Sequence, residues 1–306
     1  MSAWTYCPSI GAAIPFAILF AITTSVHIFQ AAHYKKTFCW TLIMGAIWET
    51  ASFVIRTISI QHPSAEGIYD VHFILFLLAP LWINAFIYML LGRMVYYYIP
   101  DKKLFRIRAE RMALIFVLLD IVFNKSFSYC MADVEKSSFI IQIGGGLLTV
   151  SDDSDTLQTG LHIYTAGVAL QEFFIFTFLY LVFTFQRRLK AECTRERKVE
   201  ARRLLWVIYI TLFLISLRIL FRIIEFSAGA GTELTQEFRT HEVYQYVLDA
   251  MLMFLALVAL NILHPGKVLV GPESEFPKKQ KKSRKQKKRE KEETALEMSS
   301  GSGAVV

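Results

Sequence analysis

One segment of this chain is apolar enough to enter a bilayer and yet carries three charges. Arg218, Arg222 and Glu225 lie within the run from 216 to 225, at spacings of four and three residues. These spacings place the three side chains on one face of a helix. A charge at the membrane centre costs about 2.5–3.5 kcal/mol on insertion scales, so such residues face a bundle interior or water. The sequence therefore predicts a membrane protein with a charged interior.

Seven apolar segments have the length of membrane-spanning helices. The chain has 306 residues, of which 54% are hydrophobic, and its mean hydropathy is +0.41. Runs of about 20 apolar residues are typical of spanning helices, and these runs are too long for barrel strands. The predicted spans are about 10–33, 38–60, 71–98, 112–148, 160–186, 203–226 and 243–263. The predicted fold is an all-α, polytopic membrane protein with seven transmembrane helices.

The charges of the predicted loops alternate along the chain. Loops rich in Lys and Arg are expected in the cytoplasm. The first, third and fifth loops, at 33–36, 102–111 and 187–203, are basic. The second, fourth and sixth loops, at 61–70, 151–155 and 227–241, contain a single Lys or Arg in total, which is Arg239. This alternation predicts that the N-terminus is outside and the C-terminus is cytoplasmic. We expect no cleaved signal peptide, because the first run lacks a basic n-region and a small-residue cleavage site.

Three regions follow from this topology: an extracellular N-terminus over 1–9, a seven-helix membrane domain over 10–266 and a polybasic cytoplasmic tail over 267–306. A block of like charges such as 277–291 is expected to be disordered. Two interpretations of the tail stay open. It binds anionic lipids of the inner leaflet, or it is a solvated segment that fixes the topology. We expect no nucleic-acid partner for a tail tethered to a membrane.

Several polar residues are predicted at membrane depth. Glu49 and Arg56 are seven residues apart, or roughly 10 Å along one helix face, so each is expected to meet another helix. Glu242, Tyr246 and Asp249 lie in the next predicted helix, at the same spacings of four and three residues as Arg218, Arg222 and Glu225. Depth places Asp249 opposite Arg222 or Arg218 and Glu242 nearer Glu225. A purely structural ion-pair lock and a site that also meets substrate both fit this pattern.

Other polar positions leave alternatives open. His27 and Gln30 are neighbours near a predicted cytoplasmic end, and whether they are interface residues solvated by head groups is left open. Pro80 is expected to free a backbone carbonyl and kink its helix. Arg93 is expected to snorkel towards the interface. Gln171 needs a partner at mid-membrane, and the adjacent Glu172 is expected to point elsewhere.

A set of short motifs in fixed order extends over about 6–266. The matching elements are Tyr6-x-Pro8, His27-x-x-Gln30, Glu49 with Arg56, Ala79-Pro80, Ala85, Tyr88, Gly92-Arg93, Asp120, Gln142 with Gly144-Gly145-Gly146, Gly160, Gly167, Gln171, Arg218, Arg222, Glu225, Glu242, Tyr246, Asp249 and His264-Pro265-Gly266. Each element is weak alone, but their order and number are specific. In these elements the chain resembles the fungal lipid-translocating exporters, the RTA-like seven-helix membrane proteins.

The resemblance implies seven helices, an outside N-terminus and a place in the plasma membrane or an internal membrane of a fungal cell. It also implies a role in moving or tolerating amphiphiles: sphingoid long-chain bases, toxic lipophilic amines, phospholipids or porphyrin. Such a role would confer stress or drug resistance. We predict that the substrate is bound by a polar set of residues. The set is Glu49, Arg56, Asp120, Gln142, Gln171, Arg218, Arg222, Glu225, Glu242, Tyr246 and Asp249.

The chain departs from the family pattern in three places. Ser52-Phe53 stands where the pattern favours Gly-Tyr, and Phe221 stands where Tyr is usual. Asp120 and Gln142 are 22 positions apart instead of about seven. Removing Phe123 to Ser137 would restore that spacing, so we hypothesise that this segment is a retained intron. The spliced transcript tests this, because a dominant message that encodes the segment would refute it.

The motifs limit the chemistry that this chain can perform. There is no Walker sequence, nucleophile elbow or HExxH motif, so we expect neither an ATP-driven pump nor an enzyme, and no cofactor. The four cysteines match no metal or redox spacing. The leading hypothesis is a translocator of amphiphilic lipids, with proton coupling through Glu49, Asp120 or Asp249 left open. The alternative is a heptahelical lipid sensor without transport. An intramembrane metal hydrolase is disfavoured, because the histidines lie mostly at predicted helix ends.

Overall fold

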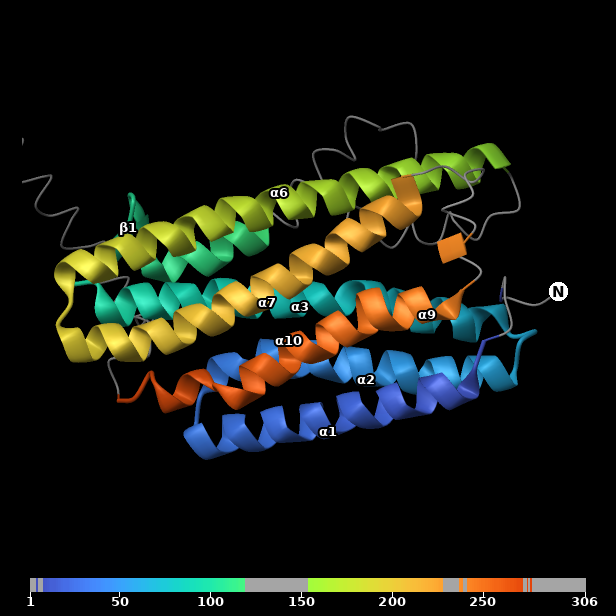
Figure 1. Cartoon of the computed structure of the whole chain (residues 1–306), viewed down its shortest axis with the longest axis horizontal. Coiled ribbons are helices and arrows are strands. Elements are labelled where there is room, and N and C mark those ends of the chain that lie inside the picture. The colour runs from blue at the N-terminus through green and yellow to red at the C-terminus, as the bar shows by residue number, and fades with distance from the viewer. Residues whose placement is uncertain are drawn as a thin grey trace, which may run out of the picture. The chain divides into compact units, whose positions relative to one another are not determined.

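The structure is a computed structural model of the chain, and it describes residues 4, 8–118, 154–227, 237–238, 241–271, 274 and 276. Within these residues, six helices are long and apolar enough to cross a membrane. They lie side by side with their long axes roughly aligned (Figure 1). The chain divides into a unit over 1–274, which contains all six helices, and a second unit over 275–306. The protein is an integral, multi-pass, helical membrane protein.

The observed helices correspond to six of the seven predicted spans. Five are single elements: α1 (Ile10–Tyr34), α2 (Trp40–Gln61), α3 (Glu66–Tyr98), α6 (Ser154–Glu192) and α7 (Arg195–Ser227). The sixth is composed of α9 (Glu242–Gln245), a π-helical turn η2 (Tyr246–Ala250) and α10 (Met251–Ile262). The remaining predicted span is 112–148. A helix begins at residue 109 and is described as far as 118, and the rest of this span lies outside the described residues.

Short elements connect and close these helices. A 3-10 turn η1 (Thr37–Cys39) precedes α2, and another, η3 (Pro265–Lys267), follows α10. Between α3 and the helix that begins at 109, strands β1 (Lys103–Leu104) and β2 (Ile107–Arg108) form an antiparallel hairpin. This two-residue pairing is a small exception to the predicted all-α fold. Leu104 is buried against the bundle, whereas Lys103 is exposed.

The helices pack in an order that brings distant parts of the chain together. In the bundle α2 packs against both α1 and α3, α10 packs against α1 and α7, and α6 packs against α7 (Figure 1). A small residue permits the close approach of α2 and α3: a Cβ added at Gly45 would lie 2.9 Å from the Ile83 side chain and 3.2 Å from the carbonyl oxygen of Ala79. Small residues have this role in many membrane helix pairs.

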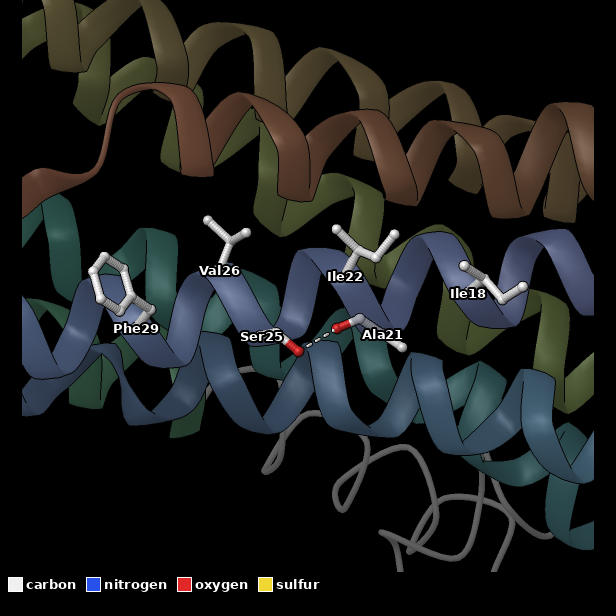
Figure 2. A pocket seen from close by; sticks show the side chains of 6 residues that line it. All are labelled: Ile18, Ala21, Ile22, Ser25, Val26 and Phe29. Atoms are coloured by element: carbon white, nitrogen blue, oxygen red, sulfur yellow. Dashed lines mark hydrogen bonds between the residues drawn. The ribbon is translucent and has the colours of Figure 1, made fainter.

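The outer surface of α1 is apolar. Figure 2 shows Ile18, Ile22, Val26 and Phe29 along one side of this helix, around a shallow hollow. Ser25 on the same side donates a hydrogen bond to the carbonyl oxygen of Ala21 at 2.8 Å. Its hydroxyl is therefore satisfied within the helix, as lipid contact requires. This face is suited to the hydrocarbon of the bilayer, and the polar residues must be sought on the opposite side.

Gly92 tests the close packing of α3. A Cβ at this position would lie 2.8 Å from the carbonyl oxygen of Ala109, a backbone atom that cannot rotate away. We expect Gly92→Ala to destabilise the purified protein by about 1–3 kcal/mol, because overpacking forces backbone shifts. The measurement is the thermal unfolding midpoint in detergent. Gly67→Ala in the same helix is the control, because no atom lies within 4 Å of its added Cβ. Equal midpoints for the two variants would contradict the packing.

Candidate functional site

The centre of the bundle holds an aspartate shared by two arginines. Asp249 lies in the π-helical turn η2, and its side chain is fully buried. One carboxylate oxygen pairs with Nε of Arg218 and the other with Nη2 of Arg222, both on α7. The predicted pairing of Asp249 with this helix is confirmed, and it involves both arginines. Arg222 also donates to Glu225 at 2.9 Å, so Arg218, Arg222 and Glu225 each have a partner of opposite sign.

Pro80 contributes to this cluster through the backbone. Proline lacks the N–H that would bond the carbonyl four residues earlier, so it leaves the carbonyl of Phe76 without its usual helical partner. Nη2 of Arg218 donates to this carbonyl oxygen at 3.4 Å. The Phe76 ring lies below both guanidinium groups, with its centroid 5.6 Å from Cζ of Arg218 and 5.3 Å from Cζ of Arg222. The proline therefore gives the cluster an acceptor within an unbroken α3.

Glu49 is the exceptional residue of this centre. It lies on α2, its exposed fraction is 0%, and its carboxylate is close enough to Arg218, Arg222 and Asp249 to interact with them electrostatically. Among the described residues, neither of its carboxylate oxygens has a hydrogen-bond partner. The two arginines are already balanced by Asp249 and Glu225. Glu49 is thus an additional carboxyl group, which needs a proton or a cation as its partner.

A second cluster joins α2, α3 and α9. Arg56 forms an ion pair with Glu242, with 3.0 Å between Nη2 and Oε1, and its Nε donates to the Tyr246 hydroxyl at 3.1 Å. The Trp4 ring lies 4.8 Å from Cζ of Arg56. The expectation that Arg56 meets another helix is confirmed. Its pairing with Glu242 was not predicted, since Glu242 was placed nearer Glu225.

His72 is the site residue that sequence reasoning missed. Its Nε2 lies 3.1 Å from Nη1 of Arg56, which can only donate, so Nε2 accepts. The ring proton is then on Nδ1, which lies 3.0 Å from the carbonyl oxygen of Ser52. The Ser52 hydroxyl completes the pair by donating to the carbonyl oxygen of His72 at 3.0 Å. The departure at Ser52-Phe53 was the available signal, because it puts a hydroxyl where the family pattern has glycine.

The remaining predicted residues are dispersed. Gln171 on α6 is buried, and so is the adjacent Glu172, whose carboxylate lies near Ser216 of α7. Asp120 and Gln142 lie outside the described residues, as does the segment 123–137. The structure therefore brings together three carboxylates and two arginines at the centre, and Arg56, Glu242 and Tyr246 in a neighbouring cluster.

The opposite end of the bundle has a polar cluster of its own. His27 is almost fully buried, which argues against solvation by head groups, and within the described residues neither ring nitrogen has a hydrogen-bond partner. His264 accepts from the backbone N–H of Gly266 at 3.1 Å and stacks on Tyr34 with ring centroids 5.1 Å apart. Arg93 lies 4.1 Å over the Phe38 ring, so it packs into this cluster instead of snorkelling freely. The stacking of His264 on Tyr34 holds the segment after α10 against α1.

The chemistry available to this arrangement is electrostatic. Within the described residues, no three His, Cys, Asp or Glu side chains are grouped to hold a metal ion. The central carboxyl groups and guanidinium groups lie in a region of low dielectric, where charge interactions are strong and unpaired charges are costly. Such a site is suited to recognising a charged head group.

The comparisons with known proteins identify relatives that share most of this chain. A family described as RTA1 like protein matches residues 42–271. A protein of Emericella nidulans named "Probable lipid transporter atnI" is 38% identical over 288 residues, which cover 90% of this chain and 71% of the relative. No solved structure is significantly similar.

More distant relatives have related names. The "Lipid-translocating exporter-like protein RTA1" of Leptosphaeria maculans is 28% identical over 294 residues, which cover 88% of this chain and 52% of the relative. This chain thus spans about half the length of that protein. The "Sphingoid long-chain base transporter RSB1" of Saccharomyces cerevisiae is 26% identical over 308 residues, which cover 88% of this chain and 75% of the relative.

The shared aspartate leads to a stability prediction. We expect Asp249→Asn to destabilise the protein by about 3–5 kcal/mol, because it leaves a buried guanidinium charge uncompensated. Adding Arg218→Gln should recover part of this loss by restoring neutrality. The thermal unfolding midpoint of purified protein in detergent measures both effects. A double variant less stable than Asp249→Asn alone would show that charge balance is not what Asp249 supplies.

Proposed function

This chain belongs to the RTA1-like family, and on that basis we propose that it translocates amphiphilic lipids between the two leaflets of its membrane. The observation that carries the proposal is Glu49. It is a fully buried carboxyl group beside two arginines that already have carboxylate partners. A fixed structural lock would be complete without it. A binding site for a cation requires such a group.

The pairing of the arginines favours an amine over a phosphate as the head group. A phosphate would have to displace Asp249 from Arg218 or Glu225 from Arg222, and both acids are buried with them. An ammonium group can instead approach Glu49 without breaking an existing ion pair. The proposed substrates are therefore cationic amphiphiles such as sphingoid bases and lipophilic amines. A relative named as a sphingoid long-chain base transporter supports this choice.

The route would follow the polar interior while the acyl chain stays in lipid. The substrate amine would leave its leaflet, pair with Glu49 at mid-bundle and release a proton if one is bound there. In the reverse step, a proton would replace the departing amine. This exchange keeps the buried carboxyl group neutralised at each stage, which its surroundings demand. The remaining members of the predicted set, Asp120 and Gln142 included, complete the proposed groove.

The orientation belongs to the same proposal. The basic loops support an orientation with the N-terminus outside and the C-terminus in the cytoplasm. The polybasic region over 267–306 would then lie on the cytoplasmic side, beyond the seven-helix domain. A cysteine introduced at residue 9, labelled with a membrane-impermeant maleimide on intact cells that carry a cysteine-free background, tests this assignment independently of transport.

Glu49→Gln tests the function. We expect it to reduce the flux of a fluorescent sphingoid base across proteoliposomes by about 30-fold or more, because losing one partner of a buried ion pair costs about 2–5 kcal/mol. Flux is measured as the loss of outer-leaflet fluorescence after adding a quencher. Glu172→Gln is the matched control, since it neutralises another buried carboxyl group that is not part of the charged centre.

Two outcomes would overturn the proposal. Equal flux with wild type and Glu49→Gln would remove Glu49 from the route. Saturable binding of the amine in detergent, with no flux above that of protein-free vesicles, would favour the alternative of a lipid sensor. Size-exclusion profiles and unfolding midpoints of both variants show whether a loss of flux reflects a loss of fold.

A further inference from the structure

The β1–β2 hairpin borders an open hollow that the transport proposal does not use. The hollow has a volume of about 580 Å³ and is lined by Asp101, Lys103, Phe105, Arg106, Thr184 and Arg188. It lies where the hairpin meets the end of α6, at the same end of the bundle as the basic loops. Three of its six lining residues are cations and one is an acid, so its lining is net positive.

The charges of this hollow are only partly balanced. Arg188 is engaged: it donates to the carbonyl oxygen of Lys103 at 2.9 Å, and it lies 3.8 Å from Asp101 and 3.4 Å from Glu192. The side chains of Lys103 and Arg106 make no hydrogen bond or ion pair with any residue that the structure describes. Arg188 thus holds the hairpin in place and leaves these two cations open to a ligand.

The hairpin contains an unfavourable charge pair and two unfavourable backbone conformations. Lys103 stands directly opposite Arg108 in the register, and like charges in that relation repel. Lys102 and Phe105 both have left-handed backbone conformations, with φ of 51° and 49°. Bulky residues rarely adopt this region, and strain of this kind is typical of functional sites. An anion bound beside Lys103, the member of this pair that lines the hollow, would offset part of its repulsion with Arg108.

An apolar track leads away from the hollow along α6. Phe105 is 52% exposed and stacks on Tyr180, with ring centroids 5.9 Å apart. The exposed aromatic residues of α6 continue this track away from the hollow: Phe173, Phe176, Tyr180 and Phe183. At about 1.5 Å per residue, the ten steps from Phe173 to Phe183 cover about 15 Å. This is half of the roughly 30 Å hydrocarbon core, which is the depth of one leaflet.

We propose that this hollow binds an anionic phospholipid of the inner leaflet, with its head group on Lys103 and Arg106 and an acyl chain along the aromatic face of α6. The combination of open cations, a strained aromatic residue at the interface and a track one leaflet long fits a lipid better than a soluble anion. Aromatic residues beside Lys and Arg are typical of the membrane interface. The site is separate from Glu49, so it does not rest on the proposed translocation, and only its assignment to the inner leaflet rests on the proposed orientation.

The test is a lipid titration of the full-length protein in detergent, followed by native mass spectrometry. Short-chain phosphatidylserine is the probe, and short-chain phosphatidylcholine is the zwitterionic comparison. We expect Lys103→Ala with Arg106→Ala to weaken phosphatidylserine binding by about 30-fold, the effect of two basic residues near an anionic head group. Lys190→Ala with Arg195→Ala removes the same charge from exposed positions that do not line the hollow. This control should change binding by less than about twofold.

Two further arms separate a lipid from a free anion. Phe105→Asn should weaken phosphatidylserine binding by about fivefold and keep the unfolding midpoint, because Asn tolerates the left-handed conformation. Inorganic phosphate should not displace the lipid. Displacement by phosphate, equal binding of phosphatidylcholine, or equal losses in the two double variants would each overturn the proposal.

Discussion

The interior of this protein depends on one carboxylate held between two guanidinium groups. Asp249 allows Arg218 and Arg222 to lie at the centre of an apolar bundle, and without it α7 would present charges to hydrocarbon. The pairing fixes the relative depth of α7 and the last spanning segment. Other features adapt to it: a proline supplies a carbonyl to Arg218, and a phenylalanine ring underlies both guanidinium groups.

A bundle of this kind distinguishes structural charges from functional ones by their pairing. Asp249, Glu225 and Glu242 each have an arginine partner that balances the buried charge. Glu49 is buried as completely as Asp249, yet within the described residues it has no hydrogen bond. The difference is informative because burying either of these two carboxyl groups removes it fully from water. Because burying a carboxyl group without a protein partner costs free energy, we infer that the partner of Glu49 is a proton or a substrate.

The sequence predicted the parts of this site that follow from helix periodicity and from the cost of charge in lipid. Arg218 and Arg222 had to share a face, and Asp249 was the acid at a matching depth. Arg56 had to find its partner on another helix, because Glu49 lies two turns away on the same helix and is out of its reach. The contacts of His72 were not predicted. The expected span began at 71 and put His72 at its edge, whereas α3 begins at Glu66 and carries His72 into the bundle. Likewise, proline chemistry identifies the orphan carbonyl of Phe76, but only the packing of α7 on α3 reveals its donor.

The bonds between helices differ in strength, and this has a consequence for motion. The mutual bonds of Ser52 and His72 join α2 and α3 into one rigid pair. Across to α7 and the last spanning segment, that pair is joined by the Arg56–Glu242 ion pair, by the hydrogen bond from Arg56 to the Tyr246 hydroxyl and by the long 3.4 Å contact from Arg218 to Phe76. Glu49 lies on this rigid pair, while both central arginines lie across the seam from it. If the bundle rocks open to admit a head group, it should part along that seam, with the long carbonyl contact yielding before the Arg56–Glu242 ion pair.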